Sequence, residues 1–434
     1  KINYGARADF FMNRNAFKFD LLTLFLYLAL ALMGWMTIYA VSSTSGGTDP
    51  FDLNYNHGRQ FLWIGISLVA AMVIMSLDNR FLEAVSYLFY GGAIALLLLV
   101  LIFGKEVNGA KSWLIIGGFQ FQPSELAKTA TAMALAKYMS KLNFSLSNPK
   151  DSIIAGLIIV VPALIIILQN DTGSALVFGS FMIVFFREGQ HPVIPIFLIL
   201  VAVVALLSLW LEQAWIVVGI VFGLSVISFL VLFDRKKIIS LLLIHLVAFA
   251  FFSTLAFSTQ FLVSKLQPHQ QIRLKVLFNP EIDPSGSGYN VIQSKIAIGS
   301  GGIMGKGFLD GNYTKYKFVP KQVTDFIFCT IGEELGWIGS TFVLLLFFGL
   351  ILRLRFIAEN SKTRYARIYG YSVISILFFH VLINVGMTVG LVPVIGIPLP
   401  FFSYGGSSLL SFTILIAILV NLFSYRSTVL GAKY

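Results

Sequence analysis

Apolar runs of bilayer length recur along almost the whole chain. A helix that crosses a bilayer needs about 20 predominantly apolar residues, and by that criterion we expect about twelve crossing helices. The predicted spans cover roughly residues 20–42, 60–77, 82–103, 123–138, 152–168, 172–186, 192–211, 214–233, 238–263, 326–352, 369–388 and 408–425. The pattern predicts an all-α polytopic membrane protein. The span at 123–138 is the weakest, because Glu125 and Lys128 interrupt it.

Composition and charge agree with this fold class. Of the 434 residues, 57% are hydrophobic and 12% are charged, whereas soluble domains carry about 25% charged residues. With the N-terminus inside, 19 of the 31 Lys and Arg residues lie in inner segments and only three lie in the short outer loops. The positive-inside rule then places both termini in the cytoplasm. The net charge of +11 is therefore largely a topology signal, and we expect no nucleic-acid partner.

The chain divides into one large domain and two short ends. We expect residues 1–19 to be a cytoplasmic segment, of which 1–11 precede Met12 and are left out of fold reasoning as an upstream extension. Residues 20–425 form the transmembrane domain, and 426–434 form a cytoplasmic tail. The single Cys329 excludes a disulfide framework and a cysteine-based metal site. The five His residues show no ligand spacing, so no metal site is predicted.

Polar residues concentrate in three segments that this topology places on the outer side, at 105–128, 264–325 and 391–408. The second is a large outer loop without obvious elements, and such loops are usually functional. The third is rich in Pro and Gly, and irregular backbone at membrane depth persists only inside protein or beside a wet cavity. We therefore expect the active face on the outer, periplasmic or extracellular, side.

The start of the weak span carries candidate chemistry. Gln122, Pro123 and Ser124 precede Glu125, with Pro at the first helical position and Glu facing the positive end of the helix dipole. Glu125 and Lys128 lie on one helix face and can pair within the bilayer. This spacing fits a structural ion pair and a substrate-binding pair equally well. On the preceding loop, Trp113 is typical of an interfacial anchor.

A glycine-rich run follows in the large outer loop, at 299–307. Its exposed backbone N–H groups beside Lys306 could form a nest that binds anions such as phosphates, but a plain flexible loop is favoured. Arg273, Lys275 and Lys295 add positive charge nearby in the sequence and raise the anion hypothesis slightly.

Asp325 opens the apolar run that follows the large loop. An N-cap is the favoured interpretation, since Asp is common there. A general base beside an apolar wall is the alternative. Glu333 would lie about 12 Å further along a helix, beyond the roughly 6.5–9.5 Å of an inverting carboxylate pair. Glu333 and Glu334 are either functional or structurally paired, and Asp171 is expected to cap a turn.

Several motifs in order resemble the SEDS family (shape, elongation, division and sporulation). They are NGAKSW, FQPSELAK, QNDTGSA, GSGYNVIQSKIAIGSGGIMGKG, VPKQVTDFIFCTIGEELGWIG and PVIGIPLPFFSYGGSS. IQSKIAIGSGG followed by GKGFLDG favours the elongation branch over the division branch. The resemblance implies a peptidoglycan glycosyltransferase of the bacterial cytoplasmic (inner) membrane that polymerises lipid II into β-1,4 glycan strands. Asp325 would be the general base and undecaprenyl diphosphate the leaving group.

The resemblance also implies a partner and a set of binding residues. The partner is a class B penicillin-binding protein, which is a transpeptidase; no cofactor is certain, and a divalent cation could assist the diphosphate. The implied substrate-binding residues are Lys111, Trp113, Gln122, Ser124, Glu125, Lys128, Arg273, Gln293, Ser294, Lys295, Ser300, Gly301, Lys306 and Ser403. Asp171, Glu333 and Glu334 would have structural roles.

The sequence departs from the family pattern at four positions within these motifs. Ser112 and Gln120 stand where the family usually has basic residues, and Lys321 and Val323 stand where it usually has Glu and His. The family core has ten spans, so roughly 192–233 is expected to be an inserted helical pair, which preserves sidedness.

Two other functions stay open at this point. A lipid II flippase needs a polar path through both leaflets, whereas the intramembrane charges here gather toward the outer half. A twelve-helix solute transporter predicts repeat symmetry between the halves, and the single large loop in the second half disfavours it.

Overall fold

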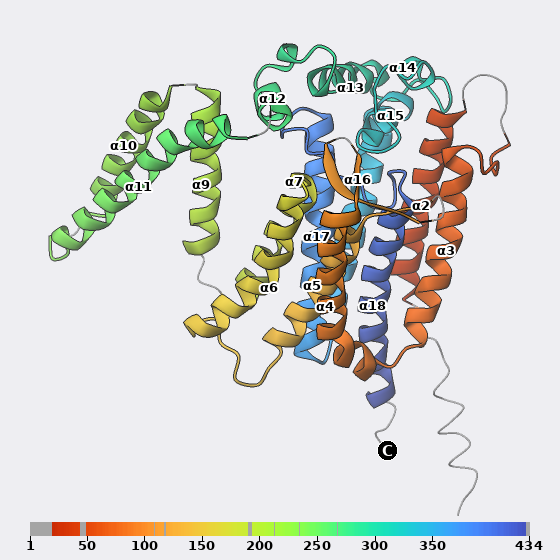
Figure 1. Ribbon diagram of the computed structural model, residues 1–434, viewed down its shortest axis with the longest axis horizontal. Coiled ribbons are helices and arrows are strands. Elements are labelled where there is room, and N and C mark those ends of the chain that lie inside the picture. The colour runs from red at the N-terminus through yellow and green to blue at the C-terminus, as the bar shows by residue number, and fades with distance from the viewer. Residues whose placement is uncertain are drawn as a thin grey trace, which may run out of the picture. The chain divides into compact units, whose positions relative to one another are not determined.

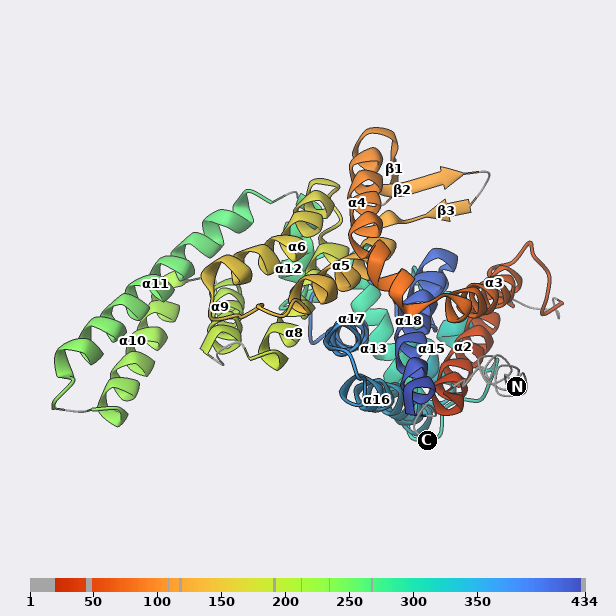
Figure 2. The ribbon, with the colours of Figure 1, turned by 90° about the horizontal axis from the view of Figure 1, so that it is seen from below.

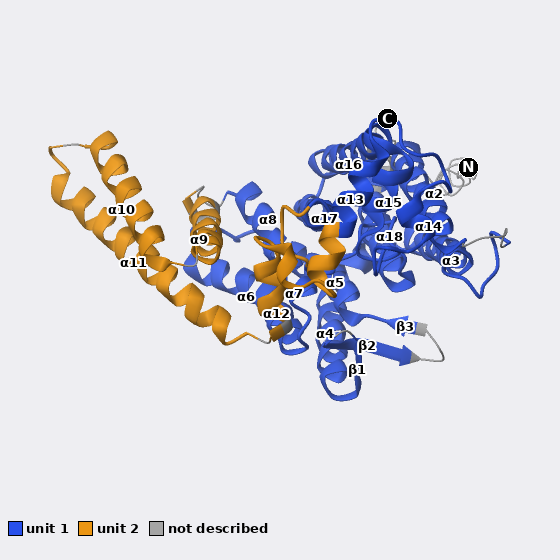
Figure 3. Ribbon diagram, turned by 90° about the horizontal axis from the view of Figure 1, so that it is seen from above, with its two compact units in different colours: residues 1–189, 293–389, 395–434 blue, residues 190–292, 390–394 orange. Residues whose placement is uncertain are grey.

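The computed structural model describes residues 20–43, 49–107, 109–116, 119–189, 193–211, 213–233, 235–266 and 268–430. The predicted N-terminal segment 1–19 lies outside these residues. The predicted tail begins within a helix that continues to Leu430, and its last four residues also lie outside. The chain forms two compact units (Figure 3), which we describe separately. Unit 1 comprises 1–189, 293–389 and 395–434, and unit 2 comprises 190–292 and 390–394.

Nine helices within the described residues are long and apolar enough to cross a membrane, which confirms the polytopic membrane fold (Figure 1). In unit 1 they are α2 (Leu21–Ser42), α3 (Asn56–Ser76), α4 (Asn79–Phe103), α6 (Pro149–Leu168), α16 (Gly336–Glu359), α17 (Arg364–Thr388) and α18 (Gly406–Leu430). In unit 2 they are α10 (Ala214–Val231) and α11 (Ile238–Ser264).

The other three predicted spans are shorter or broken helices. They are α5 (Pro123–Met139), α9 (Val193–Trp210) and the succession of α7 (Thr172–Val177), the 3₁₀ turn η1 (Phe178–Phe181) and α8 (Met182–Arg187). The predicted span at 172–186 corresponds to one short apolar helical segment, Thr172–Arg187, whose centre is a 3₁₀ turn. The turn contains Gly179, and Gly has a low intrinsic helix propensity.

The predicted span at 326–352 is also two helices. The short α15 (Ile327–Glu334) ends before the crossing helix α16 starts at Gly336, whose φ of +65° lies in the left-handed region. A side chain at this position would also lie about 2.2 Å from the backbone nitrogen of Gly305. Glycine is therefore the residue that permits the break.

Helix α5 lies at the centre of unit 1, among α4, α6, α17 and α18. Fifteen of its 17 residues are buried, and most of them are Ala, Thr, Ser or Met. Small side chains allow neighbouring helices to approach closely. The weak apolar signal of this span thus has a physical cause, because α5 contacts protein on nearly all sides instead of lipid.

The segments predicted to be outer contain more structure than the sequence predicted. A small antiparallel sheet beside α4 consists of β1 (Lys105–Val107), β2 (Ala110–Ile116) and β3 (Phe119–Phe121) (Figure 2). The large loop contains α12 (Pro268–Val276), η2 (Pro280–Ile282), α13 (Ser287–Gly301) and α14 (Asn312–Lys315). The expectation of a loop without elements was therefore wrong.

Unit 2 is built on α9, α10 and α11, which pack around Val204, Val217 and Ala256. Polar contacts also join these helices. The Ser208 hydroxyl donates to the Ala256 carbonyl at 2.7 Å, and the Ser228 hydroxyl lies 3.2 Å from His245 Nε2. The predicted inserted pair corresponds to α9 and α10.

Candidate functional site

Asp325 is not the N-cap of the helix that follows it. Helix α15 begins at Ile327, and its N-cap position is Phe326, whose side chain makes no capping hydrogen bond. The favoured N-cap interpretation was therefore wrong. The half-buried carboxylate instead faces Gly396, where Oδ2 lies 3.4 Å from the place a β-carbon would occupy. Gly396 has a φ of +79° and leaves the space beside the carboxylate open.

Three successive main-chain carbonyls at Asp325 and the two residues before it are held by donors from elsewhere in unit 1. We call this arrangement the carbonyl clamp. It consists of Tyr404 N to Val323 O at 2.9 Å, Ser403 Oγ to Thr324 O at 2.5 Å, and Asn384 Nδ2 to Asp325 O at 2.9 Å. The clamp fixes the backbone from which the Asp325 side chain projects.

The segment 395–405 supplies the other side of the clamp. Asn384 Nδ2 also donates to Ile397 O at 2.8 Å, and Ser403 Oγ accepts from Leu399 N at 2.8 Å. A β-carbon at Gly34 of α2 would lie only 2.6 Å from the Cα of Phe402, so this segment packs directly on a crossing helix. The irregular backbone of 395–405 is thus buried in protein, as its membrane depth requires.

A fully buried charge lies on α5, one turn into the helix. Lys128 Nζ donates to Glu125 Oε1 at 2.8 Å, and the two side chains are 0% and 2% exposed. The ammonium also lies 2.9 Å from His380 Nε2 of α17 and 5.0 Å from the centroid of the Phe412 ring. The predicted Glu125–Lys128 pair is confirmed. The second carboxylate oxygen, Glu125 Oε2, is buried without a hydrogen-bond partner.

His380 joins this ion pair to the segment below Asp325. Its Nδ1 lies 3.2 Å from the carbonyl oxygen of Pro398, which can only accept, so Nδ1 carries the proton and Nε2 accepts from Lys128. His380 and Asn384 are four residues apart on one face of α17. That face therefore contacts both the buried charge and the carbonyl clamp. Sequence reasoning missed both residues, although polar side chains within the predicted span at 369–388 were an available signal.

A second polar cluster lies at the start of α5. Asp171 caps α7, as predicted, by accepting from Ser174 N at 3.0 Å. Gln122 Nε2 donates to Asp171 Oδ2 at 2.8 Å, and the Ser124 hydroxyl lies 3.4 Å from the Ser174 hydroxyl. Gly173 approaches the Ile395 carbonyl so closely that a β-carbon would lie 2.9 Å from it. The cluster therefore adjoins the same segment as the clamp.

Glu333 anchors the loop before Asp325. Its buried carboxylate accepts from Lys306 Nζ at 2.9 Å, from Tyr313 N at 2.9 Å, and from both the N–H and the hydroxyl of Thr314 at 2.8 and 2.9 Å. Gln322 Nε2 links this group onward to Thr314 and Thr330. Lys306 is therefore engaged by a buried carboxylate, which gives Glu333 the structural pairing that was one of its two predicted roles.

The glycine-rich run packs backbone against backbone. A β-carbon at Gly301 would lie 2.0 Å from Gly332 O, and one at Gly305, where φ is +81°, would lie 2.1 Å from Glu334 O. The N–H groups of Lys306 and Gly307 donate to the carbonyls of Glu333 and Glu334, both at 3.0 Å. The favoured flexible loop was therefore wrong. Gly301 has a packing role, and the substrate contact that the resemblance implied stays a prediction.

Glu334 is the last residue of α15, outside the crossing helices, and only 3% exposed. Its pKa is raised to about 8, mainly by burial and to a smaller extent by the nearby Glu333 and Asp310 carboxylates, against the lowering effect of a hydrogen bond from Leu309 N–H. Its Oε1 is buried without a hydrogen-bond partner. The side chain is therefore largely protonated at neutral pH.

Further predicted residues have contacts of their own. Lys111 Nζ donates to the Leu101 and Ile102 carbonyls at 2.9 and 3.1 Å, so it caps the end of α4. Trp113 lies on β2 opposite Lys105.

Four more predicted residues belong to α13. The Ser294 hydroxyl donates to Thr388 O at 2.9 Å, and the Ser300 hydroxyl donates to Ala297 O at 2.8 Å. Lys295 is exposed and Gln293 is half-buried. Arg273 belongs to unit 2. Among the described residues, no group of three or more His, Cys, Asp or Glu side chains could hold a metal ion, so no ligand set for a divalent cation emerges.

The arrangement has the parts of a general-base site. A carboxylate on a backbone that the carbonyl clamp holds lies beside Gly396, and the buried charges on α5 are paired. Such a group can accept a proton from a hydroxyl that approaches it while its own position changes little.

Comparison with known proteins identifies relatives over nearly the whole chain. The chain is 33% identical to the peptidoglycan glycosyltransferase RodA of Treponema pallidum over 432 residues, covering 94% of this chain and 98% of the relative. It is 34% identical to the peptidoglycan glycosyltransferase MrdB of Escherichia coli K12, covering 85% of each. Stage V sporulation protein E of Bacillus subtilis is 32% identical, covering 94% and 97%.

Solved structures share the fold. A chain from work described as "Structural coordination of polymerization and crosslinking by a peptidoglycan synthase complex" aligns with a TM-score of 0.67 at 28% identity, covering 94% of this chain and 98% of that one. RodA of Thermus thermophilus aligns with a TM-score of 0.61 at 24% identity, covering 95% and 99%. The FtsW/RodA/SpoVE family profile, described as a cell cycle protein, matches residues 20–218 and 191–428, and the two matches overlap within the inserted pair. The chain belongs to the FtsW/RodA/SpoVE family.

Proposed function

We propose that this protein is a peptidoglycan glycosyltransferase that polymerises lipid II into β-1,4 glycan strands during cell elongation. Two relatives at 33% and 34% identity are named peptidoglycan glycosyltransferases and belong to the RodA and MrdB group. The observation that carries the proposal is the carbonyl clamp, which fixes the backbone at Asp325.

The reaction follows from one base and a good leaving group. The Asp325 carboxylate takes the proton of the acceptor sugar's 4-hydroxyl, whose oxygen attacks the anomeric carbon of the donor. The bond from that carbon to the diphosphate breaks, undecaprenyl diphosphate leaves with the bonding electrons, and the anomeric configuration inverts. Diphosphate leaves as a stable anion, so no second carboxylic acid is needed to protonate it.

The lysines predicted to bind substrate differ in whether a protein group already binds them. Lys111 caps α4, and Lys128 and Lys306 pair with buried glutamates. Lys295 is exposed on α13, and we keep it as the candidate for contact with the diphosphate in unit 1. Gln122 and Ser124, beside segment 395–405, are candidates for positioning the sugars.

We further propose that the protein resides in the bacterial inner membrane with both termini in the cytoplasm and the Asp325 face outside. The excess of inner over outer basic residues, 19 against three in the short loops, supports this orientation. We propose a class B penicillin-binding protein as its partner, since a structure with the same fold comes from a complex that polymerises and crosslinks peptidoglycan.

Polymerisation of lipid II by the purified protein, with and without the partner, tests this function. Asp325→Asn should reduce the rate on the order of 100- to 10,000-fold, which is the usual contribution of a general base. Asp283→Asn, on the same outer loop, is the matched control, because Asn can still accept the Ser287 N–H that Asp283 binds. Undiminished glycan chains from Asp325→Asn would refute the assignment of the base.

Vesicles with labelled lipid II in the inner leaflet separate this function from a flippase. A polymerase leaves that label on the inner side, whereas a flippase moves it outward. Outward movement that survives Asp325→Asn would favour the flippase.

A further inference from the structure

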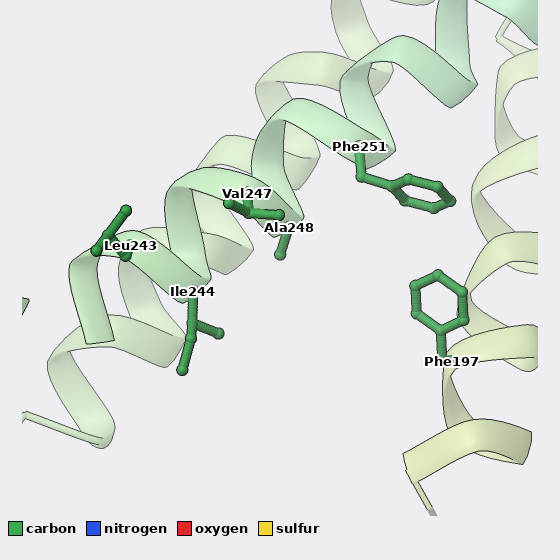
Figure 4. A pocket seen from close by; sticks show the side chains of 6 residues that line it. All are labelled: Phe197, Leu243, Ile244, Val247, Ala248 and Phe251. Carbon is green, nitrogen blue, oxygen red and sulfur yellow. The ribbon is translucent and has the colours of Figure 1, made fainter. Parts of the chain in front are cut away.

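An apolar groove lies within unit 2, between α9 and α11. It has a volume of about 510 Å³, and its lining is entirely apolar, consisting of Phe197, Leu243, Ile244, Val247, Ala248 and Phe251. Figure 4 shows Phe197 and Phe251 facing each other at one end of the groove, where their ring centroids are 5.2 Å apart. From that contact the two helices diverge toward the start of α11.

The open end of the groove points toward a cluster of basic residues. Arg235, Lys236 and Lys237 directly precede the start of α11 at Ile238, and all three are exposed. Leu243 lies only about 7.5 Å along the helix from Ile238, at 1.5 Å per residue. The sequence of this turn, FDRKK, contains one Asp against three basic residues. The groove therefore has an apolar interior and a cationic rim.

We propose that this groove binds one anionic glycerophospholipid of the inner leaflet, with an acyl chain between α9 and α11 and the phosphate on Arg235, Lys236 and Lys237. The groove runs about 12 Å along α11 from Leu243 to Phe251, close to the roughly 15 Å depth of one leaflet's hydrocarbon. A zwitterionic lipid would satisfy the apolar groove but not the excess of positive charge. The leaflet follows from the orientation proposed above, whereas the binding itself does not depend on glycosyltransferase activity.

The bound lipid has a structural role in unit 2. Helices α9 and α11 are joined at Ser208–Ala256 and at Phe197–Phe251, and they separate below these contacts. A chain in the groove fills the space that the two helices leave open, and its dispersion contacts hold their inner halves together. The lipid thus binds as part of unit 2 and exchanges more slowly than the surrounding bilayer.

The test is lipid retention by the purified full-length protein. The protein is purified from nanodiscs that contain either phosphatidylglycerol or phosphatidylcholine, and native mass spectrometry then counts the lipids that remain bound. We expect one retained phosphatidylglycerol and no retained phosphatidylcholine. Arg235→Gln with Lys236→Gln and Lys237→Gln should weaken retention on the order of 100-fold, since each basic residue near the surface contributes about fivefold in affinity for anionic lipid.

Three further variants distinguish lipid binding in the groove from general binding of lipid to the protein surface. Ala248→Phe fills the groove and should remove the bound lipid, whereas Val226→Phe, at an exposed position on α10 outside the lining, should leave it in place. Lys141→Gln with Lys150→Gln and Lys362→Gln removes the same amount of charge from other exposed positions and should have no effect. Equal retention of both lipids, or equal loss in the control variants, would overturn the proposal. Polymerisation measured on the same samples reports separately on the proposed function.

Discussion

Helices α5 and α11 differ most in how much of each is buried within the protein. Helix α5 has 17 residues, of which 15 are buried, and it contains the buried Glu125–Lys128 pair. Helix α11 has 27 residues, and none of its most apolar 18-residue window is buried within the protein. Hydropathy therefore measures contact with lipid. The buried Glu125–Lys128 pair lies where that signal is weak, because a buried charge can persist only where protein groups satisfy it.

The largest expected effect comes from breaking the buried pair on α5. Glu125→Gln leaves the Lys128 ammonium without a carboxylate and should lower the free energy of unfolding by about 3–5 kcal/mol. Unfolding in detergent, followed by heat or denaturant, measures the loss. Glu125→Gln with Lys128→Met removes both charges and should recover much of it, so that α5 becomes more like α11.

The matched control for this prediction is an exposed ion pair. Arg187 and Glu359 lie 2.7 Å apart with side chains 38% and 34% exposed, so Glu359→Gln should cost at most about 1 kcal/mol. Equal losses from Glu125→Gln and Glu359→Gln would show that the buried pair is no more important to stability than a surface one.

The next effect is a dependence of stability on pH that comes from Glu334. Burial raises its pKa from 4.5 to about 8, so between these values the folded protein holds a proton that the unfolded chain has lost. This contribution to stability is complete below pH 4.5 and is lost as the pH rises through 8. Glu334→Gln stays neutral, and its stability relative to wild type should be higher at pH 9 than at pH 5 by on the order of 2–4 kcal/mol.

Glu281→Gln serves as the control for this pH dependence, because Glu281 is exposed. Its unfolding midpoint should follow the wild type across the same pH range. A Glu334→Gln protein that also follows the wild type would contradict the raised pKa.

A smaller loss of stability, but a specific loss of activity, is expected at the carbonyl clamp. Asn384→Leu removes the donor to Asp325 O and Ile397 O and should cost about 1–3 kcal/mol, since buried acceptors lose their partner. The backbone at Asp325 then loses one of the three hydrogen bonds of the carbonyl clamp. We expect the turnover rate of lipid II polymerisation to fall about tenfold or more, with little change in KM.

Asn421→Leu is a close control for this substitution. Asn421 Nδ2 donates to two carbonyls, Ile74 O and Leu77 O, at 2.8 and 3.0 Å, in the same way as Asn384 but at the end of α3. It should lose similar stability and keep its turnover rate. Equal activities in the two variants would mean that the clamp does not position the base.

The smallest effect is expected in unit 2. Ser208→Ala removes the hydrogen bond to Ala256 O between α9 and α11 and should cost about 0.6 kcal/mol, the average for such bonds in membranes. Ser264→Ala, at the exposed end of α11, should change almost nothing. A loss at Ser208 as large as that at Glu125 would remove the contrast between the two regions.

Apolar run length predicted the nine helices of crossing length among the described residues, and three shorter helical segments, because that property is local to each segment. The break between α15 and α16 depends on the approach of Gly336 to Gly305, which are 31 positions apart in the chain. Likewise, the helix α13 ends in glycines that sequence statistics assign to a loop, and their packing against Gly332 and Glu334 decides the outcome. Such contacts between distant backbones leave no periodic signal.

The charged pair of the candidate site was predictable from the sequence, but the residues that hold the backbone around Asp325 were not. The spacing of Glu125 and Lys128 predicted their pair, since both lie on one helix. Asn384 and His380 bind main-chain carbonyls of segment 395–405. Every residue has such a carbonyl, so the sequence does not indicate which one a side chain will bind. Local preference favoured a helix cap for Asp325, whereas donors from α17 and from Ser403 fix it one residue before the N-cap position.

The burial of α5 has a consequence for how the protein is made. A segment that carries Glu125 and Lys128 enters a bilayer poorly by itself, because each charge at mid-membrane costs at least about 2.5 kcal/mol on insertion scales. Helices α4 and α6, its neighbours both in sequence and in space, must therefore accompany it from the translocon. His380 arrives only when α17 is synthesised, more than 200 residues later. During this interval the nascent chain holds an incompletely satisfied lysine, and this stage of biogenesis is where we expect membrane chaperones and quality-control proteases to act.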